Sequence, residues 1–220
     1  MISRLKKIFH EVFPNYFRAF KKSLKGMHTL LDVGCGANSP VQYLNPKPYV
    51  VGLDVFMPSI ERSKAKGIHH EYLNMNFSEL AQDIKPHSYD CVLANDVIEH
   101  LEKEEGIKFI ETLEKIAKKR VIIFTPNGFV PQEPFEGNPW QKHLSGWSVE
   151  EMWSRGYRVY GINGWKVLRS EMCEIKWRPK LFWLVISYLT QPLAYIFPSL
   201  AYQIFCVKEI EHKLLTNKKP

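Results

Sequence analysis

Short apolar runs alternate with amphipathic stretches along most of the chain. Runs such as those starting at Tyr49 and Tyr89 are four to seven residues long and are bounded by turn residues, which is typical of strands buried on both faces of a parallel sheet. Residues 103–119 instead repeat apolar positions at helical spacing, with Glu and Lys between them. This alternation predicts an α/β fold, in which a mostly parallel sheet carries helices on both faces.

The pattern places each element within a few residues. The predicted strands are 30–33, 49–54, 70–73, 89–94, 120–125, 157–162 and 202–208. Predicted helices follow at 40–44, capped by Asn38 or Ser39, at 58–66 before Gly67, at 103–119, and from Ser148 to Gly156, where Ser148 and Glu151 form a capping box.

The N-terminal residues 3–25 carry two apolar helical stripes separated by Pro14, with Lys and Arg on the opposite face. Residues 1–27 are therefore predicted to be an amphipathic helical extension of the main domain, residues 28–210. The favoured interpretation is a helix pair that packs on the sheet and closes a cofactor pocket. The alternative is a basic segment that lies on an anionic membrane.

Residues 181–207 contain no charged side chain, and this uncharged segment is long enough for a membrane-spanning helix. Pro192, Pro198 and the polar Gln191 oppose that interpretation. We expect an apolar helical insertion at about 177–200, followed by the last strand and a tail at 211–220. The insertion could contact a membrane, a partner, including a second copy in a homodimer, or its own core.

Composition narrows the partners and the compartment. The formal charge of +7 and the pI of about 9.1 favour phosphorylated substrates, acidic lipid surfaces or nucleic acid. Four cysteines without a CxxC pair indicate free thiols in a reducing, cytoplasmic compartment, and no metal site is expected. The N-terminus has no secretory signal pattern.

The segment LLDVGCGANSP, residues 30–40, predicts a nucleotide site. A buried strand ends at Asp32, and Gly34 and Gly36 leave bare backbone where a ligand can approach closely. Asp54 ends the next strand, twenty residues after Gly34, where a carboxylate can accept hydrogen bonds from ribose hydroxyls. Together these residues predict one adenosine-binding site.

Four motifs in this order resemble those of class I S-adenosylmethionine-dependent methyltransferases of the small-molecule, lipid or sugar type (methyltransferase type 11-like). They are LDVGCGAN, VVGLDVF, YDCVLANDVIEHL and VIIFTPNG, and the similarity covers about residues 29–208. Ser39 occupies the place of the third glycine of a dinucleotide fingerprint, which disfavours NAD and FAD. The resemblance implies a Rossmann-like doubly wound sheet of seven strands with an antiparallel last strand. It also implies S-adenosyl-L-methionine as cofactor and S-adenosyl-L-homocysteine as product.

The resemblance also implies cofactor contacts. The backbone of Gly34 and Gly36 would lie against the methionine portion, and Asp32 would hold either the loop alone or the cofactor ammonium as well. Asp54 would accept from both ribose hydroxyls. The remaining implied contacts are Asn76 with adenine and Asn95 with the methionine moiety.

Two histidines are candidates for a catalytic base: His100 after the fourth strand, and His143 in the loop after the fifth. A histidine titrates near neutral pH, which allows the role, but a structural role is equally compatible with each sequence position. Candidate acceptor contacts are Asn127, Trp140, Gln141 and Trp147.

The motifs most resemble those of enzymes that methylate a hydroxyl, amine or carboxylate of a small molecule, lipid or sugar. A glycolipid or polysaccharide precursor at the inner face of a membrane suits the apolar and basic segments. RNA or DNA methylation is an alternative, disfavoured because NDVIEH stands where an NPPY-type tetrad would be. A cofactor-binding module without catalysis is the other alternative.

Overall fold

A computed structural model describes residues 13–134 and 137–211 of the chain. The predicted tail and most of the first N-terminal helical stripe lie outside the described residues. The second stripe forms α2 (Tyr16–Ser23), whose N-cap Asn15 accepts a hydrogen bond from the Arg18 amide.

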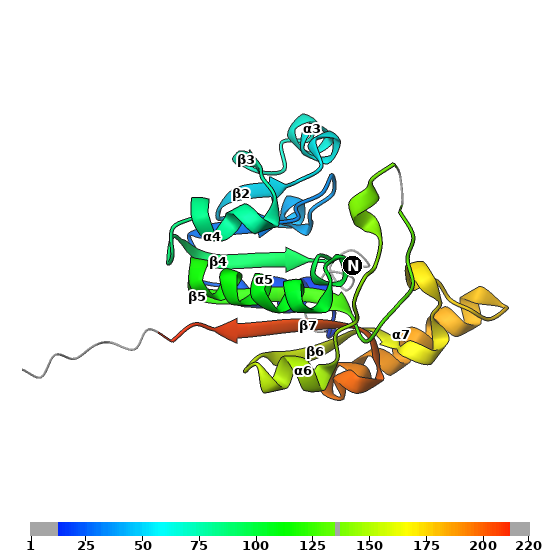
Figure 1. Cartoon of the computed structure of the whole chain (residues 1–220). Coiled ribbons are helices and arrows are strands. Elements are labelled where there is room, and N and C mark those ends of the chain that lie inside the picture. The colour runs from blue at the N-terminus through cyan, green and yellow to red at the C-terminus, as the bar shows by residue number, and fades with distance from the viewer. Residues whose placement is uncertain (1–12, 135–136, 212–220) are drawn as a thin grey trace, which may run out of the picture.

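One seven-stranded sheet forms the centre of the molecule (Figure 1). Its order is β3-β2-β1-β4-β5-β7-β6, with β7 antiparallel to both neighbours and every other pairing parallel. This confirms the predicted Rossmann-like fold with an antiparallel last strand. The strands are β1 (Thr29–Val33), β2 (Tyr49–Asp54), β3 (Glu71–Asn74), β4 (Tyr89–Asn95), β5 (Ala117–Pro126), β6 (Arg158–Trp165) and β7 (Ala201–Glu209).

Helices cover both faces of the sheet, as the sequence predicts. The described α-helices are α2, α3 (Met57–Ala65), α4 (Leu80–Asp83), α5 (Lys103–Ile116), α6 (Val149–Ser154) and α7 (Lys180–Ile196). Short 3-10 turns join them, namely η1 (Pro40–Tyr43), η2 (Phe77–Glu79), η3 (Ile98–His100), η4 (Pro139–Gln141), η5 (Lys166–Leu168), η6 (Glu171–Cys173) and η7 (Pro198–Leu200). The expected helix after the glycine loop is the single turn η1, capped by the Ser39 side chain.

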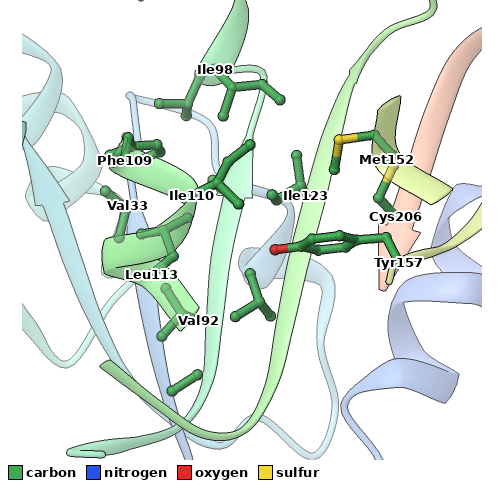
Figure 2. Close-up of a cluster of buried hydrophobic side chains, with 14 of the residues drawn as sticks. Val33, Val92, Ile98, Phe109, Ile110, Leu113, Ile123, Met152, Tyr157 and Cys206 are labelled. Atoms are coloured by element: carbon green, nitrogen blue, oxygen red, sulfur yellow. The ribbon is translucent and has the colours of Figure 1, made fainter. Parts of the chain in front are cut away.

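The helix predicted over residues 103–119 ends earlier, at Ile116, because Ala117 already pairs with Tyr89 in the sheet. Its apolar stripe nevertheless packs as expected. Figure 2 shows Phe109, Ile110 and Leu113 of α5 lying against Val92 and Ile123 of the sheet, within one buried cluster. The long apolar side chains therefore bind α5 to this face of the sheet.

A second core lies on the other face and includes the N-terminal helix. Ala19, Phe20 and Leu24 are buried there with Leu93 and Phe205 of the sheet. The alternation of β4 explains the two cores, since Val92 and Leu93 point to opposite faces. The expectation that α2 packs on the sheet is confirmed.

The apolar insertion forms α7, which packs along β6. Pro192 does not interrupt this helix as the sequence suggested. Pro192 is exposed, and the buried Gln191 beside it bonds to β6. A Cβ on Gly161 of β6 would lie 2.1 Å from the carbonyl oxygen of Ala194, so the close approach requires glycine. Among the described helices none is long and apolar enough to cross a membrane.

Candidate functional site

A cavity of about 360 Å³ lies at the carboxyl ends of β1 and β4. This is the edge where open parallel sheets bind ligands, and the volume falls in the range typical of small-molecule sites. Its lining brings together four segments distant in sequence, which are the glycine loop after β1, helix α3, the end of β4 and the loop after β5. The polar lining residues include Asp32, Asn38, Arg62, Asn95, Asp96, Asn138 and Gln141.

The glycine loop is held against the end of β2. The amides of Gly34 and Cys35 donate to the Leu53 carbonyl oxygen over 2.7 and 2.9 Å. Gly34 has φ +71°, and a Cβ there would lie 2.5 Å from the Val97 side chain. A side chain at this position would be both strained and obstructed, which explains the first glycine of the motif.

Asp54 joins the glycine loop to the segment after β2. Its Oδ2 accepts from the Gly36 amide and its Oδ1 from the Phe56 amide, each over 2.8 Å. Burial raises the pKa of the Asp54 carboxyl, and these two amides oppose the rise. The side chain is only 9% exposed. The ribose contact predicted for it stays a prediction.

Asp32 is buried, and its Oδ2 is held from two sides. Ser39 Oγ donates to it over 2.5 Å, and His69 Nε2 lies 2.8 Å away. His69 is in turn fixed by Ser63, whose Oγ lies 3.2 Å from Nδ1. Asp32 thus orders the loop in the way the sequence allowed, while contact with the cofactor ammonium stays a prediction. No signal in the sequence connects His69 to this loop.

A chain of polar side chains crosses the end of β4. Asn95 accepts from the Tyr16 hydroxyl over 2.6 Å and donates to Asp96 Oδ2 over 2.8 Å, while Gln203 donates to Asp96 Oδ1 over 3.2 Å. Surrounding protein atoms raise the pKa of the Asp96 carboxyl to about 7, although its side chain stays open to solvent at the cavity wall. Helix α2 therefore reaches the site through Tyr16, a contact that sequence reasoning missed.

Asn76 is outside the cavity lining. Its side chain accepts from the Ser78 amide, and Glu79 completes a capping box at the start of η2. The side chain is exposed beyond the end of β3. An adenine contact by Asn76 stays a prediction.

The four predicted acceptor contacts fall into two groups, those at or beside the cavity and those away from it. Gln141 lines the cavity, and Trp140 beside it is 52% exposed. Asn127 instead donates to the carbonyl oxygens of Pro198 and Ala201, and so ties β5 to η7. Trp147 is completely buried, and its indole donates to the Ile98 carbonyl oxygen over 3.1 Å. The predicted role of Trp147 in acceptor binding is corrected to packing, because no acceptor can reach it.

The two candidate bases lie together. The rings of His100 and His143 are 4.8 Å apart between centroids. Burial lowers the pKa of His100 to about 4 and also lowers the pKa of His143, so both rings are neutral at pH 7. Glu99 is buried beside them, and burial together with the Asp96 carboxylate raises its pKa well above the ordinary value. The sequence placed Glu99 at this sheet edge but gave it no role.

Comparisons with known proteins identify the same kind of domain that the fold and the glycine loop indicate. The family model described as "Methyltransferase domain" matches residues 31–125. No match was found among proteins with curated functions.

Three solved structures illustrate the likeness of the whole fold. A SAM-dependent methyltransferase from Archaeoglobus fulgidus is 16% identical, with a TM-score of 0.54 over 93% of this chain and 99% of that chain. The methyltransferase domain of bacterial CtHen1 is 15% identical, with a TM-score of 0.54 over 88% and 96%. The plantazolicin methyltransferase BamL, solved with SAH and a triazolic desmethylPZN analog, is 15% identical, with a TM-score of 0.53 over 89% and 82%.

The fold, the glycine loop with its two carboxylates and the family match define an enzyme of the methyl-transferring class. The chain carries a class I S-adenosylmethionine-dependent methyltransferase domain, and S-adenosylmethionine is its methyl donor. The residues present suit this cofactor, since Asp32, Gly34 and Gly36 line the cavity and would place backbone and a carboxylate beside it. Asp54, which lies outside the cavity lining, ends the adjacent strand β2 and bonds to the Gly36 amide. When bound, the cofactor supplies an electrophilic methyl group on a sulfonium.

Proposed function

We propose that the enzyme transfers the methyl group to a hydroxyl, amine or carboxylate of a small-molecule, lipid or sugar acceptor. The observation that carries the proposal is the shared lining of the cavity, where the cofactor loop faces Asn138 and Gln141 of the loop after β5. An acceptor held by this loop would lie next to the cofactor.

Methyl transfer from a sulfonium is an in-line displacement that depends first on positioning. Asn138 and Gln141 offer amide groups that can orient an acceptor, and the exposed Trp140 offers an aromatic face. In the absence of a metal ion, His100 and His143 are the candidates for taking up the acceptor proton, because both are neutral at pH 7. The pKa of about 4 makes His100 a weak base.

A lipid-linked acceptor is supported by the inverted polarity of α7. The stripe that faces the protein is small and polar, namely Ser187, Gln191 and Ala194. The stripe that faces outward is apolar and 49 to 74% exposed, comprising Leu181, Phe182, Val185, Tyr188, Leu189, Leu193 and Ile196. A helix that faced only water would have the opposite arrangement.

The surroundings of α7 suit an anionic membrane surface. Lys176, Arg178 and Lys180 are exposed at its start, next to the half-exposed Trp177, and the chain carries a formal charge of +7. In Figure 1 the start of α7 lies at the end of the sheet toward which β4 and β5 run, as the loop after β5 does. A membrane-bound acceptor would therefore approach the cavity from the side of α7.

The acceptor is tested by a turnover screen with S-adenosylmethionine across lipid, quinone, sugar, small-amine and RNA acceptors, with product mass as the readout. We expect a mass gain of one methyl group on a lipid or sugar acceptor. Trp140→Ala should raise KM for that acceptor, whereas Trp153→Ala, which is similarly exposed at 51% but on α6, should leave KM unchanged. Methylation of RNA alone would contradict the proposed acceptor class.

Membrane contact is tested by co-sedimentation with vesicles of phosphatidylcholine and 30 mol% phosphatidylglycerol, a composition of about one anionic lipid in three. We expect the chain to bind these vesicles, and the double change Leu181→Asp and Leu189→Asp to reduce binding more than tenfold. Both side chains are at least 70% exposed, so the fold should tolerate the change, and Trp153→Asp serves as control. Failure of the wild-type chain to sediment, or self-association through α7 instead, would overturn membrane contact.

A further inference from the structure

Glu99 has a buried carboxyl group, and only one of its two oxygens has a hydrogen-bond partner among the described residues. It is 2% exposed, and its Oε2 accepts from the Thr125 hydroxyl over 2.9 Å. Its Oε1 has no hydrogen-bond partner among the described residues. An unpaired carboxylate oxygen away from water is costly, so a group that binds it is expected nearby.

Each of the two histidines beside Glu99 has one ring nitrogen fixed by a backbone carbonyl oxygen. Nδ1 of His100 lies 3.1 Å from the Lys142 carbonyl oxygen, and Nδ1 of His143 lies 2.6 Å from the Val130 carbonyl oxygen. A carbonyl oxygen can only accept, so each Nδ1 carries the proton and each neutral ring keeps its lone pair on Nε2. Metal-binding histidines are commonly fixed in this way, with the second ring nitrogen donating to a carbonyl.

The three side chains converge. One ligand atom from each of Glu99, His100 and His143 lies within 4.8 Å of the others. In a tetrahedral zinc site two ligand atoms, each ~2.1 Å from the ion, lie ~3.4 Å apart, so the three side chains have to draw together by up to about 1.4 Å to complete the site.

We propose that Glu99, His100 and His143 form a binding site for a divalent transition-metal ion, of which Zn²⁺ is the best-suited example. Two imidazoles and one carboxylate are ligands for such ions, and three protein ligands leave a position open. The cysteine spacing indicated no metal site, whereas these ligands come from η3 and from a loop more than forty residues later.

The metal site lies close to the cofactor cavity along the chain, which gives the ion a role in methyl transfer. This role rests on the proposed function. Asp96 and Gln141 line the cofactor cavity and lie three and two residues from the nearest ligands, Glu99 and His143. A hydroxyl or carboxylate oxygen of the acceptor would occupy the open coordination position. The ligand class is therefore an oxygen-bearing acceptor held by the cation.

The proposed methyl transfer needs no oxidant or reductant. The ion lowers the pKa of a bound acceptor hydroxyl, whose proton leaves to solvent. The acceptor oxygen then forms a bond to the methyl carbon while the sulfur–carbon bond breaks. The electron pair of that bond stays on sulfur, so the products are S-adenosylhomocysteine and a methyl ether from a hydroxyl acceptor or a methyl ester from a carboxylate acceptor.

The site is tested by titrating the full chain, after dialysis against a chelator, with Zn²⁺ in a calorimeter and with Co²⁺ in an absorption spectrometer. We expect one ion per chain and visible Co²⁺ bands of a nitrogen- and oxygen-ligated site. Glu99→Gln keeps an acceptor for Thr125 and should weaken Zn²⁺ binding more than tenfold, as should His143→Asn. His28→Asn, which changes an exposed histidine before β1, should bind Zn²⁺ as the wild type does.

Absence of equimolar binding by the folded chain, or equal Zn²⁺ affinity in wild type and Glu99→Gln, would overturn the site. Thermal melts of the metal-free variants separate loss of a ligand from loss of the fold. S-adenosylmethionine binding is measured on the same metal-free samples, so the metal site and the proposed function can fail independently.

Discussion

Tyr16 connects the N-terminal helix to the cofactor cavity. Its hydroxyl donates to Asn95, and its ring packs edge-on against Phe124 and Phe205. We expect Tyr16→Phe to lower the free energy of unfolding by about 1 to 2 kcal/mol, because Asn95 loses a buried donor. Chemical denaturation measures the change, and Tyr188→Phe, an exposed tyrosine on α7, is the matched control. An unchanged free energy of unfolding would contradict the coupling.

Individual site residues were predictable only where the motif itself carries the information. The spacing of Gly34 and Asp54 predicts neighbouring strand ends, and β1 and β2 are indeed paired in parallel. The contacts of His69 and Tyr16 could not be predicted from the sequence. His69 lies 37 residues from Asp32, and Tyr16 lies 79 residues from Asn95. Trp147 was misassigned since loop tryptophans give no sign of whether they face a cleft or the core.

At the scale of elements, β6 and α7 form a unit that depends on small residues. We expect Gly161→Ala to destabilise the fold by about 1 to 3 kcal/mol, because its Cβ would meet the Ala194 carbonyl oxygen of α7. Thermal unfolding measures the loss. Gly26→Ala gives the cost of backbone strain without a clash, since Gly26 has φ +77° and open space around it, whereas Gly161 has the clash without a left-handed φ. Equal stability of Gly161→Ala and wild type would show that α7 is not packed this closely.

The spacing of apolar residues predicted which segments form helices and strands, but it did not predict several of their boundaries. All seven strands lie close to where the apolar runs predicted them. The signal is continuous for β1, β2 and β4, which are buried on both faces, and it is weaker for the edge strand β3, which has no buried residue. The end of α5 was misplaced, since Ala117 fits a helix locally but pairs with β4 in the sheet. Helix α7 continues through Pro192, and the side chain of the adjacent Gln191 bonds to Gly161 and Gly164 of a strand about thirty residues earlier, a contact that no local pattern shows.

At the scale of the molecule, two apolar cores hold a rigid sheet and leave its carboxyl edge to function. The cofactor loop lies at this edge, and the loop after β5 and α7 carry the residues proposed to select the acceptor. Cofactor binding therefore depends on the sheet itself, and acceptor choice on segments added to it. This division explains why the sequence indicates a methyl donor plainly but does not identify the acceptor.

We infer that the sheet edge formed by Gly34, Gly36 and Asp54 binds S-adenosylmethionine. Calorimetric titration of the full chain should give one cofactor per chain. Asp54→Ala should weaken binding by about 10- to 150-fold, since a charge-assisted hydrogen bond contributes roughly 1.5 to 3 kcal/mol, and Asp83→Ala, at the end of α4, should not. A folded wild-type chain that binds no S-adenosylmethionine, or binds it as tightly after Asp54→Ala, would contradict the account.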